Sequence, residues 1–202
     1  MNNEKTLPVM ETFYSVQGEG TYAGCPAFFI RLGGCDVGCV WCDVKDSWDA
    51  SKHPQIKVTA LVEQVVLSGA PICVVTGGEP AMHNLELLTE ALLEKGIRAH
   101  IETSGVYPLT GTWNWVTFSP KKFKSPHESI YIAANELKVI VFHKSDIEWA
   151  GEHASKVDTT CSLYLQPEWE KRESMQPLIL DFIKKNTAWR ISVQTHKYLG
   201  VE

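Results

Sequence analysis

The sequence predicts an α/β fold: a partial TIM-type β/α barrel of about six parallel strands joined by helices. Short apolar runs alternate with amphipathic segments, which is the pattern of repeated strand–helix units around a parallel sheet. Most of the apolar runs are followed by glycine, proline or polar residues, and barrel-type enzymes build their active sites at this edge of the sheet. About six such strands are too few for a closed barrel of eight.

The first half of the chain supplies three predicted strands, over Glu11–Val16, Ala27–Leu32 and Ile72–Val75. Thr59 is a candidate N-cap for a helix that reaches Leu67 and stops at Gly69, because its apolar residues recur on one helical face. Asn84 is expected to cap a second amphipathic helix, which ends at Gly96.

The second half continues the alternation, with predicted strands over Arg98–Thr103, Trp115–Phe118, Leu137–Phe142, Ser162–Leu165 and Trp189–Thr195. Ser145 and Glu148 form a capping box that opens a helix of a few turns. Ser174 is expected to cap the last helix, with Pro177 in its first turn, where proline is tolerated. No linker or repeat interrupts this pattern, so residues 1–202 are predicted to form a single domain.

The composition is that of an ordinary globular protein, with 44% hydrophobic and 21% charged residues among 202. A formal net charge of −5 argues against a nucleic-acid surface, and the basic group Lys121–Lys124 is too short to change that. Met1–Met10 lacks the apolar run of a signal peptide, and no stretch approaches the ~18 apolar residues of a membrane span. We expect a cytoplasmic protein with reduced thiols and no membrane or nucleic-acid partner.

Three cysteines crowd into the loop that follows the second strand, over residues 33–48. Cys35, Cys39 and Cys42 have the spacing C-x3-C-x2-C, which is typical of metal ligation rather than of disulfides. Iron–sulfur clusters held by protein alone usually take four ligands, so three cysteines suggest a [4Fe–4S] cluster with one iron open to a non-protein ligand. The spacing alone leaves open a zinc site completed by a nearby aspartate, Asp36 or Asp43.

A second motif, Thr76-Gly77-Gly78-Glu79-Pro80, directly follows the strand Ile72–Val75. Glycines let the backbone approach a ligand closely, and Glu79 adds a carboxylate. By itself this motif reads as an ordinary strand-to-helix turn. Together, the cysteine loop and this turn resemble the radical S-adenosylmethionine (radical SAM) superfamily. The resemblance implies that the amino and carboxylate groups of S-adenosylmethionine chelate the open iron, with the turn meeting the amino group.

Further motifs narrow the resemblance to the 7-carboxy-7-deazaguanine synthase family and span the chain nearly end to end. They are Phe13–Gly20, Pro26–Leu32, Trp41–Asp43, Ile101–Gly105, Ser119–Lys121 and Gln194–Leu199. The resemblance implies a lyase that converts 6-carboxy-5,6,7,8-tetrahydropterin to 7-carboxy-7-deazaguanine and ammonia, for queuosine or other 7-deazapurine biosynthesis. It also implies that a 5′-deoxyadenosyl radical removes hydrogen from C6, after which the ring contracts and the cofactor is regenerated.

Alternation along the strands places polar side chains on shared faces. Arg31 shares a face with Phe29, and a second polar face comprises His100, Glu102 and Ser104. In the last predicted strand, Ser192, Gln194 and His196 likewise oppose Ile191 and Val193. Polar faces that converge on an enclosed space suggest a ligand that needs many hydrogen bonds. An arginine in such a strand needs a partner, and both a structural ion pair and a clamp on a substrate carboxylate satisfy that need.

The resemblance assigns roles residue by residue. The cysteines that would hold the radical-generating cluster are Cys35, Cys39 and Cys42. The residues that would contact the pterin are Val16, Gln17, Gly18 and Thr76. Arg31 would bind its carboxylate, and Glu19, Glu102 and His196 would bind its amine and ring groups. The residues that would hold S-adenosylmethionine are Trp41, Cys42, Asp43, Gly78, Glu79, Ser104, Ser119, Pro120 and Lys121. Lys138 is either a further ligand or an exposed lysine leading into a strand.

One position departs from the family pattern. The family usually has Thr or Ser directly after Cys-Asp, and its hydroxyl binds a magnesium ion that touches the substrate carboxylate. Here the position is Val44, whose side chain has no oxygen. Magnesium binds through few protein oxygens and several waters. We therefore expect reduced or absent magnesium stimulation.

Two other functions are weighed against the synthase: an activase that generates a glycyl radical in a partner protein, and a non-catalytic zinc or iron–sulfur module. An activase shares the cysteine loop and the Gly-Gly-Glu turn but has no need of Arg31 or of the motif around Gln194–His196. For the synthase, the resemblance implies a flavodoxin- or ferredoxin-type reductant and a homodimer.

Overall fold

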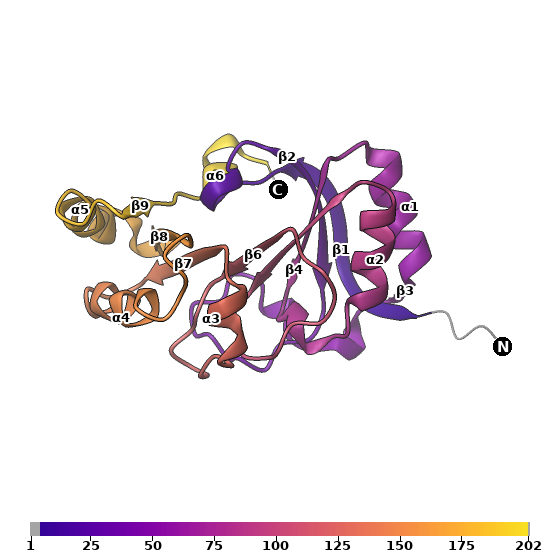
Figure 1. Cartoon of the computed structure of the whole chain (residues 1–202), viewed down its shortest axis with the longest axis horizontal. Coiled ribbons are helices and arrows are strands. Elements are labelled where there is room, and N and C mark those ends of the chain that lie inside the picture. Colours follow the sequence, from indigo (N-terminus) through magenta and orange to yellow (C-terminus); the bar gives the residue numbers. More distant parts are fainter. Residues whose placement is uncertain (1–4, 202) are drawn as a thin grey trace.

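The computed structural model describes residues 5–201, and within them nine strands form one sheet in the order β3-β1-β2-β4-β5-β6-β7-β8-β9. The strands are β1 (Thr6–Val16), β2 (Pro26–Leu32), β3 (Gln55–Lys57), β4 (Ile72–Gly77), β5 (Arg98–Thr103), β6 (Trp115–Phe118), β7 (Glu136–Val141), β8 (Ser162–Pro167) and β9 (Trp189–Ile191). In this described part, parallel pairings link β2 through β9, whereas β1 runs antiparallel to both β2 and β3. The sheet curves without closing, so the predicted partial barrel is confirmed (Figure 1).

Most of the helices lie on the outer side of the curved sheet, with the main hydrophobic core between the two layers (Figure 1). These are α1 (Val58–Ser68), α2 (Glu86–Glu94), α3 (Ser129–Ala133), α4 (Ser145–Ala154) and α5 (Arg172–Ile183). Helix α6 (Thr195–Leu199) instead lies at the opening of the curved sheet, on its concave side (Figure 1). Leu61 of α1 and Leu88 of α2 are buried against strand residues such as Ile30 and Val75. Because neighbouring residues of a strand face opposite sides, Arg31 and Thr76 are left for the concave face.

Helix starts are the least accurate part of the sequence prediction. Helix α1 begins at Val58, with Lys57 rather than Thr59 at the N-cap position. The predicted Ser145–Glu148 capping box is wrong: the carboxylate of Asp146 instead accepts from the backbone N–H groups of Phe142 (2.8 Å) and His143 (2.7 Å). The N-cap position of α2 is Leu85 rather than the predicted Asn84, although the Asn84 side chain accepts from the backbone N–H of Glu86 at 3.0 Å.

The C-terminal part of the chain differs more from the prediction. Helix α5 starts at Arg172, so Pro177 lies inside the helix rather than in its first turn. Strand β9 ends at Ile191, and the residues expected to extend it to Thr195 lead into α6. The backbone N–H and the hydroxyl of Thr195 both donate to the carbonyl oxygen of Gly18, at 2.9 and 2.8 Å. These bonds attach the segment to the loop after β1 and draw it away from the sheet.

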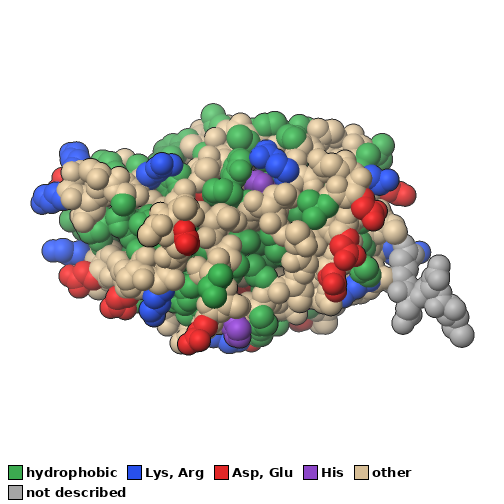
Figure 2. Space-filling view, viewed as in Figure 1, with side chains coloured by type: hydrophobic (Ala, Val, Ile, Leu, Met, Phe, Trp, Pro, Cys, Tyr) green, Lys and Arg blue, Asp and Glu red, His purple; other side chains and the backbone are tan. Residues whose placement is uncertain are grey.

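On the face shown in Figure 2, basic and acidic side chains are interspersed with hydrophobic ones, and the basic side chains form separate small groups. This face therefore presents no continuous basic surface of the kind that nucleic acids require. Among residues 5–201, no helix combines the length and the hydrophobicity needed to cross a membrane.

Candidate active site

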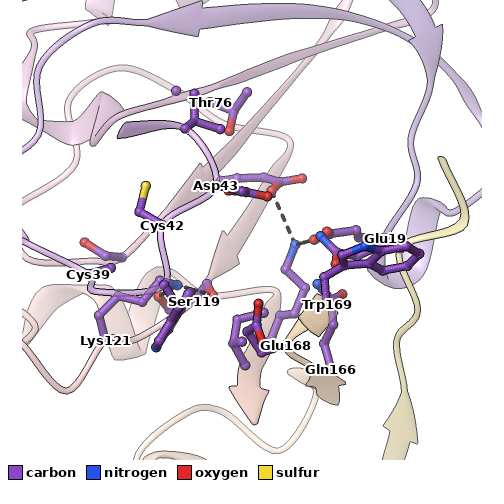
Figure 3. Close-up of a pocket in the computed structure, with 18 of the residues that line it drawn as sticks. Glu19, Cys39, Cys42, Asp43, Thr76, Ser119, Lys121, Gln166, Glu168 and Trp169 are labelled. Carbon is purple, nitrogen blue, oxygen red and sulfur yellow. Dashed lines mark hydrogen bonds and ion pairs between the residues drawn. The ribbon is translucent and has the colours of Figure 1, made fainter. Parts of the chain in front are cut away.

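A cavity of about 810 Å³ lies on the concave side of the sheet. It is lined by residues from the cysteine loop, the ends of the parallel strands, the loop after β1 and helix α6. Figure 3 shows Cys39 and Cys42 on one side of this space and Glu19 and Gln166 on the other, with Asp43 between them. The cavity therefore has a thiol end and a polar base.

The cysteine loop and the Gly-Gly-Glu turn are joined through their backbones. The N–H of Glu79 donates to the carbonyl oxygen of Gly34 at 2.7 Å, and the N–H of Gly78 donates to that of Leu32 at 2.9 Å. A Cβ atom on Gly78 would lie 2.3 Å from the Gly34 carbonyl oxygen and 2.9 Å from the Cβ of Cys35. This close packing requires glycine at position 78. The sequence predicted a close approach to a ligand at these glycines, and in the structure Gly78 makes room for the backbone of the cysteine loop.

The three thiols of the loop face the same cavity. Burial raises the pKa of Cys39 to about 11; nearby Lys121 opposes the shift, and the neighbouring thiols Cys42 and Cys35 add to it. Burial and the nearby charge of Glu79 also raise the pKa of Cys35. Three crowded thiols disfavour each other's ionisation, and a cationic iron–sulfur cluster relieves that repulsion because it binds thiolates. The donor set therefore fits such a cluster.

A single metal ion is a different case. Among residues 5–201, no group of three His, Cys, Asp or Glu side chains is arranged to hold one ion. A [4Fe–4S] cluster takes its thiolates on separate iron atoms and does not need them to converge on one point.

The Glu79 carboxylate is almost fully buried, with 1% of the residue exposed. One oxygen accepts from the hydroxyl of Thr103 (2.5 Å) and the backbone N–H of Ala81 (3.0 Å); the other accepts from the backbone N–H of Ser104 (2.8 Å) and from its hydroxyl. These four donors hold the carboxylate in a fixed orientation at the cavity wall. An ammonium group in the cavity would find a fixed negative partner there.

Ser119 and Lys121 follow β6 and complete the thiol end. The Lys121 ammonium group donates to the carbonyl oxygen and the hydroxyl of Ser119, at 2.7 and 2.6 Å, and lies 5.7 Å from the centre of the Trp41 ring. Burial lowers the pKa of Lys121. Pro120 does not line the cavity, although it was predicted to contact S-adenosylmethionine with its neighbours.

The base of the cavity contains a lysine between two carboxylates. Lys138 of β7 pairs with Glu19 from the loop after β1 and, at 3.3 Å, with Glu102 of β5. Burial raises the pKa of Glu19, but the charge of Lys138 and hydrogen bonds from Lys138 and Gln166 lower it to about 2. The alternative of an exposed Lys138 is wrong, because only 3% of the residue is accessible to solvent.

The loop after β1 closes this base. The side-chain amide of Gln17 donates to Glu102 at 2.8 Å, and the backbone N–H of Gly20 donates to the hydroxyl of Ser192 at 3.0 Å. A Cβ atom on Gly18 would lie 2.0 Å from Nδ1 of His196, so glycine lets α6 pack against this loop. Burial lowers the pKa of His196, which favours the neutral imidazole.

Arg31 lines the cavity beside its strand neighbours Phe29 and Thr76. Its Nε donates to the carboxylate of Glu11 at 2.6 Å, directly across the β1–β2 pair. The structural ion pair is thus present, and a guanidinium group that binds one carboxylate through Nε keeps its terminal nitrogens for another.

Val44 also lines the cavity, next to Asp43, whose carboxylate lies 3.3 Å from the ammonium group of Lys197. The carbonyl oxygen of Val44 accepts from the hydroxyl of Ser47 at 2.6 Å. The Val44 side chain thus adds an apolar surface where the family usually has a hydroxyl.

The structure brings together every predicted site residue except Pro120 around this one cavity. The cavity is lined by Val16, Gln17, Gly18, Glu19, Arg31, Cys35, Cys39, Trp41, Cys42, Asp43, Val44, Thr76, Gly78, Glu79, Glu102, Ser104, Ser119, Lys121 and His196. Sequence reasoning missed three lining residues: Gln166 near the end of β8, Trp169 just after it, and Lys197 in α6. The dipeptide Gln166-Pro167 at the end of a strand was the available signal.

Comparison with known proteins gives consistent results. Residues 29–116 match the model of the radical SAM superfamily. The chain is 51% identical to a 7-carboxy-7-deazaguanine synthase of Flavobacterium psychrophilum, with 96% of this chain and 92% of the relative aligned, and 53% identical to one of Synechocystis, with 97% and 94% aligned. It is also similar to the crystal structure of QueE from Escherichia coli, at a TM-score of 0.84 and 35% identity over 95% of each chain.

Proposed function

This chain belongs to the 7-carboxy-7-deazaguanine synthase family of radical SAM enzymes, and we propose that it converts 6-carboxy-5,6,7,8-tetrahydropterin to 7-carboxy-7-deazaguanine with loss of ammonia. The observation that carries the proposal is the continuity of one cavity from the three thiols to the polar base. A radical generated at one end can then reach a substrate held at the other without passing through solvent.

The thiol end is the proposed site of the cluster and of S-adenosylmethionine. Cys35, Cys39 and Cys42 would hold the cluster. When bound, the two groups supply the radical chemistry that removes a hydrogen atom from the substrate. The Gly-Gly-Glu turn would meet the amino group of S-adenosylmethionine, and four hydrogen bonds hold the Glu79 carboxylate in place within it. The residues proposed to surround the rest of the cofactor are Trp41, Asp43, Gly78, Ser104, Ser119 and Lys121.

The polar base is the proposed site of the pterin. Its bicyclic ring has donors and acceptors around its edge, and the base offers carboxylates, amides and a neutral imidazole along one wall of the cavity. Arg31 would bind the substrate carboxylate through its terminal nitrogens while Nε stays on Glu11. The other residues proposed to contact the substrate are Val16, Gln17, Gly18, Glu19, Thr76, Glu102 and His196.

Magnesium does not fit the residue that stands at the family's magnesium position. Val44 offers only a carbonyl oxygen, which already accepts from Ser47 at 2.6 Å. Since Mg²⁺ prefers oxygen ligands in octahedral geometry, we propose that this chain binds it weakly or not at all.

Further parts of the proposal concern the cellular setting. A flavodoxin- or ferredoxin-type protein would supply the electrons, and the product would enter queuosine or another 7-deazapurine pathway. We also propose a cytoplasmic homodimer. The cytoplasmic location is supported by the proposed cluster, whose cysteine ligands a reducing compartment keeps out of disulfides.

Anaerobic reconstitution with iron and sulfide tests the function. With S-adenosylmethionine, a reductant and 6-carboxytetrahydropterin, the protein should form 7-carboxy-7-deazaguanine, and a Cys39→Ala variant should not. Cleavage of S-adenosylmethionine without the deazaguanine product would favour a glycyl-radical activase instead. A metal-loaded protein that cleaves no S-adenosylmethionine would indicate a structural module.

A further inference from the structure

Lys138 is a buried cation at the cavity base whose contacts are unequal. Its ammonium group makes a close contact with Glu19 and a longer one, 3.3 Å, with Glu102. Of the two carboxylate side chains, Glu102 is the more exposed, at 23% against 14% for Glu19. Glu19 is thus the closer partner of the lysine, and Glu102 is the partner whose carboxylate remains more accessible from the cavity.

The ammonium group also has spare donor capacity. A lysine carries three N–H donors and no acceptor. Among residues 5–201, Lys138 donates to these two carboxylates only. The third hydrogen is free for a ligand in the cavity that Lys138 lines. Glu102 likewise accepts from Gln17 through one oxygen and from Lys138 through the other, and each carboxylate oxygen has a further lone pair.

Lys138 and Glu102 therefore present a donor beside a pair of acceptors. The pyrimidine ring of a pterin shows the complementary edge, with an oxo acceptor at position 4 followed by the N3–H and 2-amino donors. A carboxylate can accept two parallel N–H bonds, as it does from arginine. Two donors on neighbouring atoms can thus meet Glu102 while the oxo group meets Lys138.

We propose that Lys138 binds the 4-oxo group of the substrate and makes the site selective for 4-oxo over 4-amino pteridines. This inference rests on the proposed function. A 4-amino group in the same place would point N–H donors at an ammonium group that accepts no hydrogen bond. The mismatch leaves polar hydrogens unpaired in an enclosed site, which is an effective way to reject an analogue.

A structural role for Lys138 predicts something different. If the lysine only neutralised Glu19 and Glu102, its loss would destabilise the base and weaken both kinds of ligand equally. The ratio of the two affinities, rather than either affinity alone, therefore separates the two roles.

The test uses the reconstituted holoenzyme with S-adenosylmethionine under anaerobic conditions. The probes are pterin-6-carboxylate and 2,4-diaminopteridine-6-carboxylate, whose dissociation constants follow from fluorescence quenching. The native protein should prefer the 4-oxo probe by about tenfold or more, because only that probe forms the hydrogen bond to the charged Lys138.

Lys138→Met alone leaves two buried carboxylates unpaired and risks unfolding. The working variant is therefore Lys138→Met with Glu19→Gln, which keeps the net charge of the base, and Glu19→Gln alone is the matched control.

Compared with the Glu19→Gln control, which carries the same change at a proposed substrate contact, the double variant should lose the part of the preference that Lys138 supplies, a further fall of at least about threefold. Any remaining preference reflects Glu102, because the 4-amino probe also lacks the N3–H donor that Glu102 accepts. Equal preference in the native protein, or full preference in the double variant, would overturn the role of Lys138. Turnover of 6-carboxytetrahydropterin by the same native preparation separates this failure from a failure of the proposed function. If the native protein forms no product and binds neither probe, the proposed function and this inference both fall.

Discussion

The backbone N–H of Glu79 donates a 2.7 Å hydrogen bond to the carbonyl oxygen of Gly34, the residue immediately before Cys35. This bond connects two motifs that lie more than forty positions apart in the sequence. It fixes the Glu79 carboxylate beside the first proposed cluster ligand, so the geometry of the thiol end depends on backbone packing as well as on cysteines.

Gly78→Ala should disturb this packing. Its Cβ would lie 2.3 Å from the Gly34 carbonyl oxygen, which cannot move without shifting the cysteine loop. Overpacking of this kind costs about 1–3 kcal/mol, and we expect the variant to retain less iron after reconstitution. Gly151→Ala in α4 is the control, since its Cβ meets nothing within 4 Å and should leave iron content unchanged. Native iron content in Gly78→Ala would refute the prediction.

Variants of Arg31 and Glu11 separate the effect of their ion pair from the effect of Arg31 on substrate binding. Arg31→Lys removes the bidentate fork, so KM for the carboxypterin should rise by roughly 10- to 100-fold. Glu11→Gln removes only a partly exposed ion pair and should cost less than about 1 kcal/mol of unfolding free energy, with little change in KM. If both variants raise KM equally, the ion pair rather than a free guanidinium fork determines substrate binding.

Val44→Thr should create magnesium dependence. The new hydroxyl would stand at the family's ligand position on the cavity wall. We expect turnover of the native protein to change little when Mg²⁺ is chelated, and turnover of the variant to rise severalfold on adding Mg²⁺. Val40→Thr, on an exposed residue of the same loop, is the control. A native enzyme that needs Mg²⁺ fully would contradict the account of Val44.

Glu19 should contribute to stability in a defined pH range. Its pKa is about 2 in the folded protein, below the ordinary value of 4.5 for a glutamate, because the charge of Lys138 outweighs the cost of burial; the folded state therefore favours the ionised form. The contribution is therefore complete above about pH 4.5 and is lost as the pH falls toward 2; it amounts to about 3 kcal/mol. Urea unfolding at several pH values should show a shallower acid decline for Glu19→Gln than for the native protein. Parallel curves would argue against the Glu19–Lys138 pair.

Much of the fold and of the site follows from local sequence signals. The alternation along β2 correctly assigned its two faces, with Phe29 and Arg31 on the cavity side and Ile30 in the core. The glycines at positions 77 and 78 were expected to let the backbone approach a ligand, and in the structure they make room for the backbone of Leu32 and Gly34. These features depend on residues that are neighbours in sequence, so periodicity and motif spacing reveal them.

Features that depend on distant residues were harder to predict. A lysine near the start of a strand resembles an exposed residue, and Lys138 is buried only because Glu19, 119 positions earlier, and Glu102 meet it in the barrel. The apolar residues after Trp189 resemble a strand, but Thr195 bonds to Gly18 and a helix forms instead. Pairing across the barrel thus overrides the local pattern in both cases.

The central claim is that one cavity holds S-adenosylmethionine next to C6 of the pterin. Turnover of substrate that carries deuterium at C6 measures that proximity. If the hydrogen passes directly between them and the cofactor is regenerated, deuterium should accumulate in the S-adenosylmethionine pool as deazaguanine forms. Deazaguanine formed with no deuterium in the cofactor, or cofactor cleavage without deazaguanine, would contradict the account.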